Sequence, residues 1–237
     1  MSFKLTTQIH REKTFTHLPV NLGYDDLPTT TVNGRRQYVL PNGHSYPSIT
    51  TVLGHGKNLA IEAWKKRVGN EEAERVSRVA CTRGTSLHTL VERYINNEAE
   101  VLTGNEMPDA IAMFRTLAPE INSRIGSVYL QEKALYSAHL RVAGRTDLIA
   151  DFDGRLSVID IKSSSRVKSK RDIKNYFMQE AAYAIMFEER TGIPVDRLVT
   201  LMAVNERSTP LVFVEKRDDW TSGLLKAIHE YEESIEH

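Results

Sequence analysis

The spacing of apolar residues divides the chain into a helical first half and a second half dominated by strands. Between residues 59 and 97 apolar side chains recur every three or four positions, which is the spacing of one helical face. Gly69 and Gly84 interrupt this run, so two or three helices are expected there. A further helix is expected over 108–124, and Pro119 should break or bend it because proline lacks the N–H that a helix interior needs.

From Ser127 onward the apolar period changes to two, which predicts strands. The expected strands have the sequences "VYLQEKALYS", "HLRVAGRTDLIADFD", "RLSVIDIKSSS", "RLVTLMAVNE" and "TPLVFVEKR". A helix over 172–190, ended by Thr191-Gly192, separates the third strand from the fourth, and another helix closes the sequence. Upstream, "RQYVLPNGHSYPSIT" predicts two short strands around the turn "PNG", and a short helix begins after Ser48.

Strands and helices in this order predict a single α/β or α+β domain in which helices flank a central sheet. Residues 1–35 are mostly polar and aperiodic, and we expect them to form a loosely packed arm. The single domain is expected to span 36–237. The sequence shows no internal repeat, no low-complexity tract and no obvious linker.

Composition narrows the functional classes. Hydrophobic residues make up 41% of the chain and charged residues 26%, as in ordinary globular proteins, and the formal net charge is zero. Any binding of nucleic acid must therefore rest on local clusters of charge. The single cysteine, Cys81, excludes an intrachain disulfide framework, a multi-cysteine zinc site and a cysteine-ligated iron–sulfur cluster. With no apolar run of bilayer length and no signal-peptide core, we expect a cytoplasmic protein that does not associate with membranes.

Three charged residues lie in the middle of the two central strands: Asp147, Asp160 and Lys162. Such side chains are costly near a core unless something pairs with them. Asp153-Gly154 predicts a two-residue hairpin turn, which would place Asp147 opposite Asp160, with Lys162 on the same face. A divalent cation such as Mg²⁺ or Mn²⁺ would offset the repulsion between the carboxylates, and the lysine would polarise a water or stabilise charge on a phosphate. The alternative is a surface ion network between these carboxylates and nearby basic side chains.

A basic loop follows the second of these strands. Its cationic residues form the densest positive cluster in the sequence: Lys162, Arg166, Lys168, Lys170, Arg171 and Lys174. Binding of DNA phosphates is the natural use of such a cluster. The hydroxyls of Ser163, Ser164 and Ser165 could donate hydrogen bonds to phosphate oxygens. The alternative is a loop whose charges are only solvated.

Further candidates lie outside the predicted hairpin. Gln179 and Tyr183 are four residues apart and share a helical face, although Tyr183 also suits a core position. His88 lies on a predicted helix, where a hydrogen bond to Glu92, one turn later, is the structural alternative to metal binding. Glu132 is a single acid on the strand expected beside the first strand of the hairpin, which makes it a candidate third carboxylate.

Four short motifs follow one another along the chain: "RGTSLH", "GRTD", "DIK" and "QEAAY". Together they resemble the PD-(D/E)XK nuclease superfamily, and within it the RecB-like exonuclease group. The first resembles a helical motif that ends in a metal-binding histidine, and the second resembles the strand motif with the first aspartate. The third resembles the acid–x–lysine signature, and the fourth the Q-x-x-x-Y helix motif. "YPSITTVLG" extends the resemblance upstream, to phage and mitochondrial genome maintenance exonucleases of this family.

This resemblance implies an α/β fold with a restriction-endonuclease-like core, in which helices flank a central mixed sheet and the N-terminal half is helical. Several relatives carry an iron–sulfur cluster held by four cysteines. Because this sequence has one cysteine, no iron–sulfur cluster is expected.

The resemblance also assigns roles to individual residues. The residues that match the family's ligands for Mg²⁺ or Mn²⁺ are His88, Asp147, Asp160 and the main-chain carbonyl of Ile161, with Glu132 as an outer acid or second-metal ligand. Lys162 matches the catalytic lysine. Residues that would support the active site or contact the DNA backbone are Gln179, Tyr183 and Arg83. With the basic loop, the expected DNA-binding set is Arg83, Ser163, Ser164, Arg166, Lys168, Lys170, Arg171 and Lys174.

These features predict a metal-dependent deoxyribonuclease, and more specifically an exonuclease on single-stranded DNA ends, in replication, repair or recombination. If the protein is phage-encoded, the host cytoplasm is its expected location. By analogy with the family, the helices before Gly84 would form an arch that a free strand threads. The alternatives are a structure-specific endonuclease on the same fold and an inactive DNA-binding module. The sequence does not specify the polarity of digestion, the choice of metal, the choice between DNA and RNA, or the oligomeric state.

Overall fold

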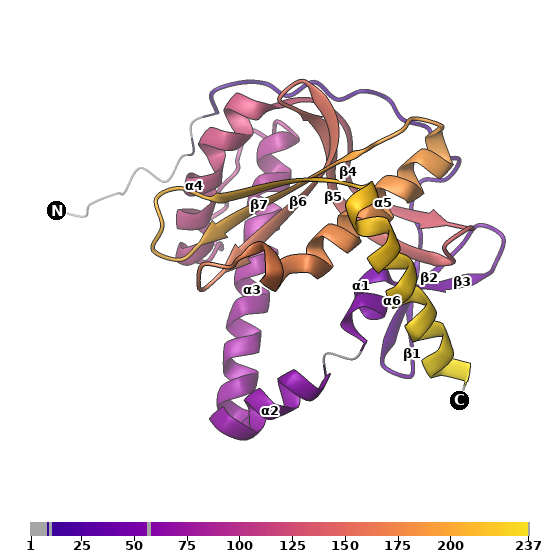
Figure 1. Ribbon diagram of the computed structural model, residues 1–237. Helices are drawn as coiled ribbons and strands as arrows, with labels where there is room; N and C mark the ends of the chain where they lie inside the picture. Colours follow the sequence, from indigo (N-terminus) through magenta and orange to yellow (C-terminus); the bar gives the residue numbers. More distant parts are fainter. Residues whose placement is uncertain (1–8, 10, 56–57, 237) are drawn as a thin grey trace.

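The computed structural model describes residues 9, 11–55 and 58–236 (Figure 1). Its centre is a five-stranded sheet with the order β4-β5-β6-β7-β8. The strands are β4 (Ile125–Ser137), β5 (Val142–Phe152), β6 (Arg155–Ser164), β7 (Arg197–Val204) and β8 (Leu211–Lys216). Strands β6 and β7 run parallel because a helical crossover connects them, and the other neighbouring pairs are antiparallel. The sheet is therefore mixed.

Helices cover both faces of this sheet (Figure 1). The helices of the described residues are α1 (Ile49–Gly54), α2 (Asn58–Val68), α3 (Asn70–Ile95), α4 (Pro108–Arg124), the short 3₁₀ helix η1 (Lys170–Ile173), α5 (Lys174–Thr191) and α6 (Asp218–Glu236), and all but α2 contribute to this cover. Leu87 of α3 and Leu148 of β5 share the core on one face, and Ala182 of α5 and Ile149 of β5 share the core on the other. Adjacent strand residues point to opposite faces, so β5 contributes to both cores. This arrangement confirms the predicted α/β fold class.

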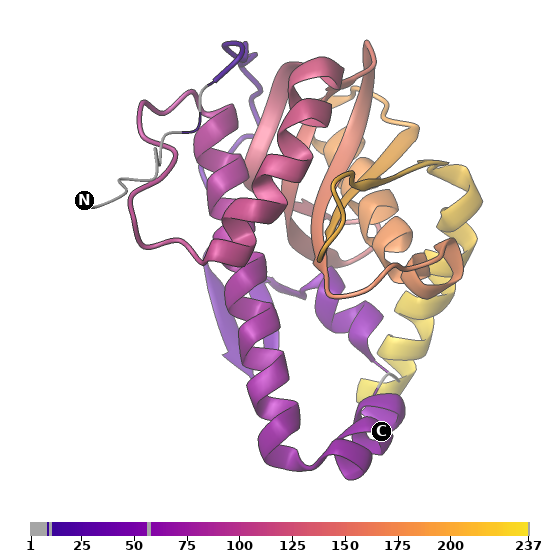
Figure 2. The same cartoon turned by 90° about the vertical axis from the view of Figure 1, so that its left-hand side faces the viewer.

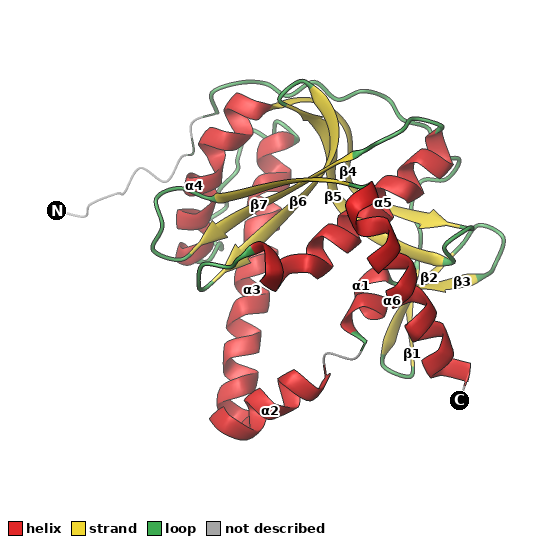
Figure 3. Ribbon diagram, in the orientation of Figure 1, coloured by secondary structure: helices red, strands yellow, loops and turns green. Residues whose placement is uncertain are grey.

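The part of residues 1–35 that the structure describes is packed, which corrects the prediction of a loose arm. A separate antiparallel sheet (Figure 3) has the order β1 (Thr29–Val32), β2 (Arg35–Val39) and β3 (Ser45–Pro47). Phe15 and Leu27 are buried, so this part of the chain adds to the core. The boundary placed after residue 35 falls inside β2, after its first residue, and divides this strand from its partner β1. The missed signal is Asn33-Gly34, whose φ values of 51° and 73° are those of a tight hairpin turn.

Helix α3 continues through Gly84, where an interruption was predicted, and the break falls at Gly69, with φ of 89°. A glycine in a helix costs about 1 kcal/mol relative to alanine, and the burial of Leu87 and Leu90 one turn later offsets that cost. Helix α4 likewise continues through Pro119, which is exposed on the solvent side of the helix. The prediction that Pro119 breaks this helix is therefore wrong.

Helix α2 and the first half of α3 project away from the central sheet (Figure 2). Residues 74–82 of α3 are all exposed, whereas Leu87, Leu90 and Val91 further along are buried. The same helix therefore has a solvated arm and a half that packs on the sheet. Within the described residues, none of the helices is both long and apolar enough to span a membrane.

Candidate active site

The two central strands separate at the level of the two predicted aspartates. The β5–β6 hairpin turns at Asp153-Gly154, with the two-residue register that the sequence predicted. Its ladder ends at the pair Leu148 and Ile159, one position before Asp147 and Asp160. Beyond this point β5 continues beside β4, and β6 continues beside β7. The sheet therefore forks where the charged side chains lie.

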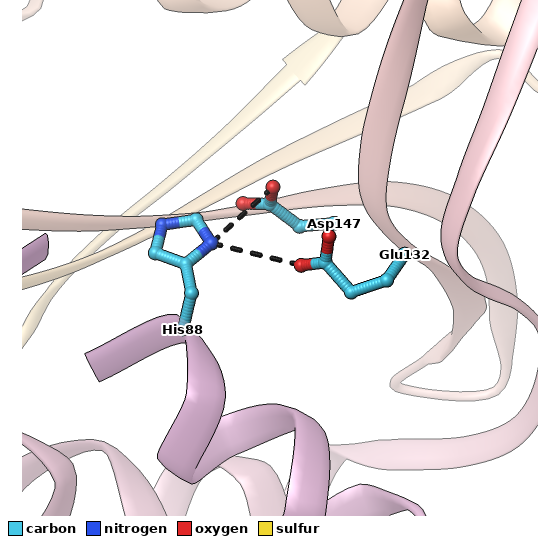
Figure 4. A group of neighbouring side chains, drawn as sticks. All are labelled: His88, Glu132 and Asp147. Carbon is cyan, nitrogen blue, oxygen red and sulfur yellow. Dashed lines mark ion pairs between the residues drawn. The ribbon is translucent and has the colours of Figure 1, made fainter. Parts of the chain in front are cut away.

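Three potential metal ligands meet at this fork (Figure 4). His88 Nδ1 of α3 lies 3.4 Å from Asp147 Oδ1 of β5 and 3.8 Å from Glu132 Oε1 of β4. The second oxygen of Asp147, Oδ2, accepts a hydrogen bond of 2.8 Å from the backbone N–H of Ile161. A cavity of about 10 Å³ adjoins the three side chains, roughly the space that one water molecule needs. One imidazole nitrogen and two carboxylate oxygens at these distances fit a divalent cation.

Glu132 reaches this group through an unusual backbone conformation. The β4–β5 register pairs Gln131 with Leu148 and Lys133 with Thr146, so Glu132 lies opposite Asp147. Its φ is 47°, in the left-handed region that side chains rarely adopt in a strand. Such a conformation costs roughly 1–3 kcal/mol and is concentrated at functional sites. The structure thus places Glu132, which the sequence offered as a third carboxylate and as an outer acid or second-metal ligand, in one group with His88 and Asp147.

Asp160 lies outside this three-residue group and on the side of the sheet that α5 covers. Its side chain is 1% exposed and forms an ion pair with Lys162. The other carboxylate oxygen, Oδ1, is buried and has no hydrogen-bond partner among the described residues. A buried anionic oxygen is costly unless something pairs with it, and a metal ligand is one such role. Asp160 therefore fits a cation at the fork even though its carboxylate faces Lys162.

The charges of the site shift the pKa values of its members apart. Burial raises the pKa of Asp160 to about 7, with Lys162 opposing the rise and Asp147 adding to it. For Asp147, the charges of His88 and Lys162 outweigh burial and lower the pKa to about 2. Burial lowers the pKa of His88, but Asp147 and Glu132 outweigh it and raise the pKa to about 10. In the metal-free site at neutral pH, His88 is therefore protonated and Asp147 is ionised.

The pair of helical residues from the Q-x-x-x-Y motif lies against strand β5. Gln179 Nε2 donates a hydrogen bond of 3.1 Å to the hydroxyl of Tyr183, and Tyr183 is buried. A Cβ at Gly144 would lie 2.8 Å from Tyr183 Cε1 and 3.0 Å from Ile49 Cγ2. The glycine of "GRTD" is therefore needed for the close approach of Tyr183 to the strand that carries Asp147.

Gly144→Ala is expected to lower the free energy of unfolding by about 1–3 kcal/mol, because the methyl group overpacks a filled site. The matched control is Gly84→Ala, where the new Cβ would lie 3.8 Å from Ser163 Oγ, an ordinary contact. This control is expected to stabilise the protein by about 0.5–1 kcal/mol because alanine is the better helix former. Urea unfolding of the two variants measures both effects. Equal effects of the same sign would contradict the packing described at Gly144.

Arg83 and Ser163 lie close to the fork, on α3 and at the end of β6. Arg83 is 7% exposed, and its Nε has no hydrogen-bond partner among the described residues. The neighbouring Gly84 lies against Ser163, as the distance to its hydroxyl shows. The structure therefore places both predicted DNA-contacting residues where α3 crosses the end of β6.

The members of the basic loop differ from one another. Lys168 donates a hydrogen bond of 3.1 Å to the hydroxyl of Tyr176, whereas Lys170 forms an ion pair of 2.6 Å with Glu215. Ser164 is buried, and its hydroxyl donates to the carbonyl of Arg166 at 2.6 Å. The exposed cationic side chains of the loop and the start of α5 are Arg166, Lys170, Arg171 and Lys174, and of these Lys170 is paired with Glu215.

Sequence reasoning missed Glu180, which follows Gln179 on α5. Glu180 is completely buried, and its Oε1 accepts a hydrogen bond from Thr200 of β7. Thr200 pairs with Asp160 in the parallel β6–β7 ladder, so Glu180 lies near the Asp160–Lys162 pair. Burial, together with the charge of Asp160, raises the pKa of Glu180 well above its usual range. An acid on an otherwise apolar helix face was the signal that could have found it.

Comparison with known families matches residues 60–230 to the PD-(D/E)XK nuclease superfamily. The matched stretch covers more than half of the chain and contains every residue of the fork. The chain belongs to the PD-(D/E)XK nuclease superfamily. This confirms the resemblance that the four sequence motifs indicated.

A curated relative of the chain is mitochondrial genome maintenance exonuclease 1 of Mus musculus. The two proteins are 26% identical over 133 residues, which are 53% of this chain and 39% of the mouse protein. The match therefore spans less than half of the mouse protein's length.

Membership in the superfamily supports the prediction of a nuclease, which is a hydrolase. Nucleases of this superfamily generally depend on divalent metal ions, and the group of His88, Glu132 and Asp147 offers suitable donor atoms. The superfamily match and this group of side chains therefore support the predictions of a nuclease and of a divalent cation.

Proposed function

We propose that this nuclease is a metal-dependent exonuclease that degrades single-stranded DNA from its ends. The observation that carries the proposal is the position of one three-donor group beside a buried lysine–carboxylate pair, both at the fork of the central sheet. The mouse relative, which is named an exonuclease of genome maintenance, supports the choice of an exonuclease. Digestion of DNA ends is a step that replication, repair and recombination all need.

Mg²⁺ or Mn²⁺ is the proposed cofactor. The proposed ligands are His88, Glu132, Asp147, Asp160 and the main-chain carbonyl of Ile161. When bound, the cation supplies a Lewis acid that polarises the phosphate and lowers the pKa of a coordinated water. The hydrogen bond from the Ile161 N–H to Asp147 holds one carboxylate oxygen in place and directs the other toward His88.

Lys162 is the proposed catalytic lysine. Burial lowers its pKa, but the carboxylates of Asp160 and Asp147 outweigh burial and hold the pKa above its usual range, so the side chain carries a full positive charge. A fixed ammonium group in a site of low polarity stabilises the charge that develops on the scissile phosphate. The ion pair with Asp160 keeps this ammonium group at the fork.

The proposed DNA contacts surround the fork. Gln179 and Tyr183 support the fork, and the residues proposed to contact the DNA backbone are Arg83, Ser163, Arg166, Lys168, Arg171 and Lys174. Two predicted residues are left out for structural reasons. The ammonium group of Lys170 is engaged by Glu215, and the buried hydroxyl of Ser164 is engaged by the Arg166 carbonyl.

The solvated arm formed by α2 and the first half of α3 supports the preference for free ends. Residues 74–82 are helical and exposed. Isolated helices of this length are rarely stable in water, so an exposed helical arm suggests a role outside the core. The arm is continuous with the half of α3 that carries Arg83 and His88, and it projects away from the sheet (Figure 2). We propose that a free single strand passes between the arm and the body of the protein.

A comparison of linear and circular single-stranded DNA tests the end dependence. With Mg²⁺ or Mn²⁺ we expect loss of a linear strand and no loss of a circle of the same sequence. Separate labels at the 5′ and 3′ ends report the polarity from the order in which short products appear. Cleavage of the circle at a comparable rate would show an endonuclease instead. Binding without cleavage of either form would leave a DNA-binding module.

Metal affinity is expected to increase with pH. In the metal-free protein the raised pKa of His88, about 10, contributes stability that is present below its unfolded value near 6.5 and is lost as pH rises through 10. A cation must displace this proton, so affinity should rise by up to about tenfold per pH unit above neutrality. Calorimetric titration with Mg²⁺ at about pH 7.5 and about pH 8.5 measures the slope. His88→Gln should flatten it, and an unchanged slope would remove His88 from the ligand set.

A further inference from the structure

We propose that Lys168 and Tyr176 form a second phosphate-binding subsite, which receives the DNA phosphate next to the one that is hydrolysed. The inference rests on the proposed nuclease site and adds to it a substrate contact with a defined position. Lys168 binds the neighbouring phosphate, and Tyr176 is a positioning residue that holds the subsite beside Lys162.

Tyr176 contacts both lysines at once. Its ring centre lies 5.2 Å from Lys162 Nζ, and its hydroxyl accepts the hydrogen bond from Lys168 Nζ. Both ammonium groups thus lie within 5.4 Å of one ring centre. A cation at such a distance from an aromatic ring is attracted to it. One rigid side chain therefore links the proposed catalytic lysine to a cation of the basic loop.

The position of Tyr176 is fixed by the protein core. The residue lies in the first turn of α5 and packs against a buried cluster that includes Ile173, Phe177 and Met202. A ring that is held on one side by this cluster keeps few rotamers. The spacing between the two ammonium groups is therefore set by the fold rather than by the flexible lysine side chains.

Lys168 is half-buried and has no carboxylate partner among the residues that the structure describes. The nearby acid Asp172 has a lowered pKa, mainly because its Oδ2 accepts hydrogen bonds from the backbone N–H and the hydroxyl of Ser169. The charge of Lys168 contributes less to this shift, and the carboxylate oxygen is already engaged by Ser169. Lys170, two residues along, is paired with Glu215. Lys168 thus differs from its neighbour in having an ammonium group held in place by a neutral partner and available to an anion.

A DNA strand supplies that anion. Phosphates repeat regularly along the backbone, so a strand whose reacting phosphate lies at Lys162 presents the next phosphate close by. A lysine held by a neutral hydroxyl keeps its charge and donors available for phosphate oxygens. The contact carries no base specificity, which suits an enzyme that digests strands of any sequence.

The test uses oligonucleotides in which one linkage is a neutral methylphosphonate. In one oligonucleotide this linkage lies on the 5′ side of a defined cleavage point, and in another it lies on the 3′ side. For the wild type we expect the neutral linkage on one of the two sides to lower kcat/KM about tenfold, the usual loss for one charged contact. Lys168→Gln should lower kcat/KM by a similar factor on unmodified DNA and should be insensitive to the neutral linkage. Tyr176→Phe, which keeps the ring and removes the hydroxyl, should reduce the discrimination between charged and neutral linkages.

Lys170→Gln is the matched control, because it removes the same charge from the same loop. We expect it to change kcat/KM less than about twofold and to keep the full sensitivity to the neutral linkage. The subsite would be overturned if Lys168→Gln and Lys170→Gln lowered kcat/KM equally. It would also be overturned if the neutral linkage lowered kcat/KM of Lys168→Gln by the same factor as that of the wild type. A base stacked on Tyr176 would instead show as sensitivity to Tyr176→Leu with no dependence on the linkage charge.

The wild type on unmodified DNA separates this inference from the proposed function. If the wild type cleaves no DNA, the nuclease proposal fails. The subsite is then tested by equilibrium binding of the same oligonucleotides in EDTA, followed by fluorescence anisotropy. There the wild type and Lys170→Gln should bind the charged strand more tightly than the neutral one, and Lys168→Gln should not. Equal discrimination by all three proteins would overturn the subsite.

Discussion

Lys162→Ala is expected to lower the rate of DNA cleavage by about 10²–10³-fold, the usual loss when one fixed donor to developing charge is removed. Metal binding should persist, because the proposed ligands remain. Single-turnover cleavage at saturating metal measures the loss. Lys133→Ala is the control, since Lys133 is an exposed lysine on β4, and it should retain the wild-type rate within about twofold. A Lys162→Ala rate within tenfold of wild type would remove the lysine from catalysis.

The same substitution should also change the pH dependence of stability. Without Lys162 the carboxylate of Asp160 is buried and has lost its partner, which typically costs about 3–5 kcal/mol. Burial already raises the pKa of Asp160 to about 7, and loss of Lys162 raises it further. A carboxyl group with a raised folded-state pKa lowers stability progressively as pH rises from its unfolded pKa to its folded pKa. Because the substitution extends this range above about 7, the loss of stability should be larger at about pH 8 than at about pH 6. Unfolding in urea at both pH values measures this difference, and activity is compared where both proteins are folded.

Asp147→Asn is expected to have the largest effect, because it removes a charged ligand from the centre of the proposed metal group. Cleavage should fall at least about 10³-fold, and calorimetry should detect a large loss of affinity for Mg²⁺ and Mn²⁺. The amide oxygen of asparagine can still accept the hydrogen bond from the Ile161 N–H, so the fold should survive.

Asp151→Asn is the control for Asp147→Asn, since it makes the same change on the same strand. Asp151 lies next to Gly126, on the hairpin side of the fork. We expect it to leave metal affinity and cleavage close to those of the wild type. Equal metal affinity in the wild type and in Asp147→Asn would contradict the proposed ligand set.

The sequence predicted the hairpin because two independent signals agreed. Asp153-Gly154 fixed a two-residue turn, and the period-two pattern fixed which residues share a face. The family motifs then identified the charged residues that lie at its open end. The helix after the basic loop was equally well marked, since Gly192 ends it with φ of 73°.

The fork of the central sheet could not be predicted from the pattern of apolar and polar residues. Separation of β5 from β6 after Leu148 depends on each strand having a different partner, which is a long-range property of the sheet. The left-handed backbone of Glu132 likewise has no local signal in the sequence, since glutamate does not favour this conformation. The predicted register does place Asp147 opposite Asp160, but the end of the paired ladder just before them was not predicted.

Other errors came from giving single residues too much or too little weight. Gly84 was expected to end a helix, but the buried turn that follows it keeps α3 continuous. Asn33-Gly34 was overlooked within a polar segment, although it forms the turn of a hairpin. Glu180 and Tyr176 lie within or beside a recognised motif, and their contacts with Thr200, Lys162 and Lys168 exist only in the folded protein.

Cleavage of an end-labelled linear single strand, with Mg²⁺ or Mn²⁺ and with EDTA, tests the central claim most directly. The wild type should degrade the strand with either or both metals, stop in EDTA, and recover when excess metal is restored. Asp147→Asn should be inactive under all of these conditions. Cleavage that survives in EDTA, or that Asp147→Asn performs as well as the wild type, would contradict a metal-dependent active site at the fork of the central sheet.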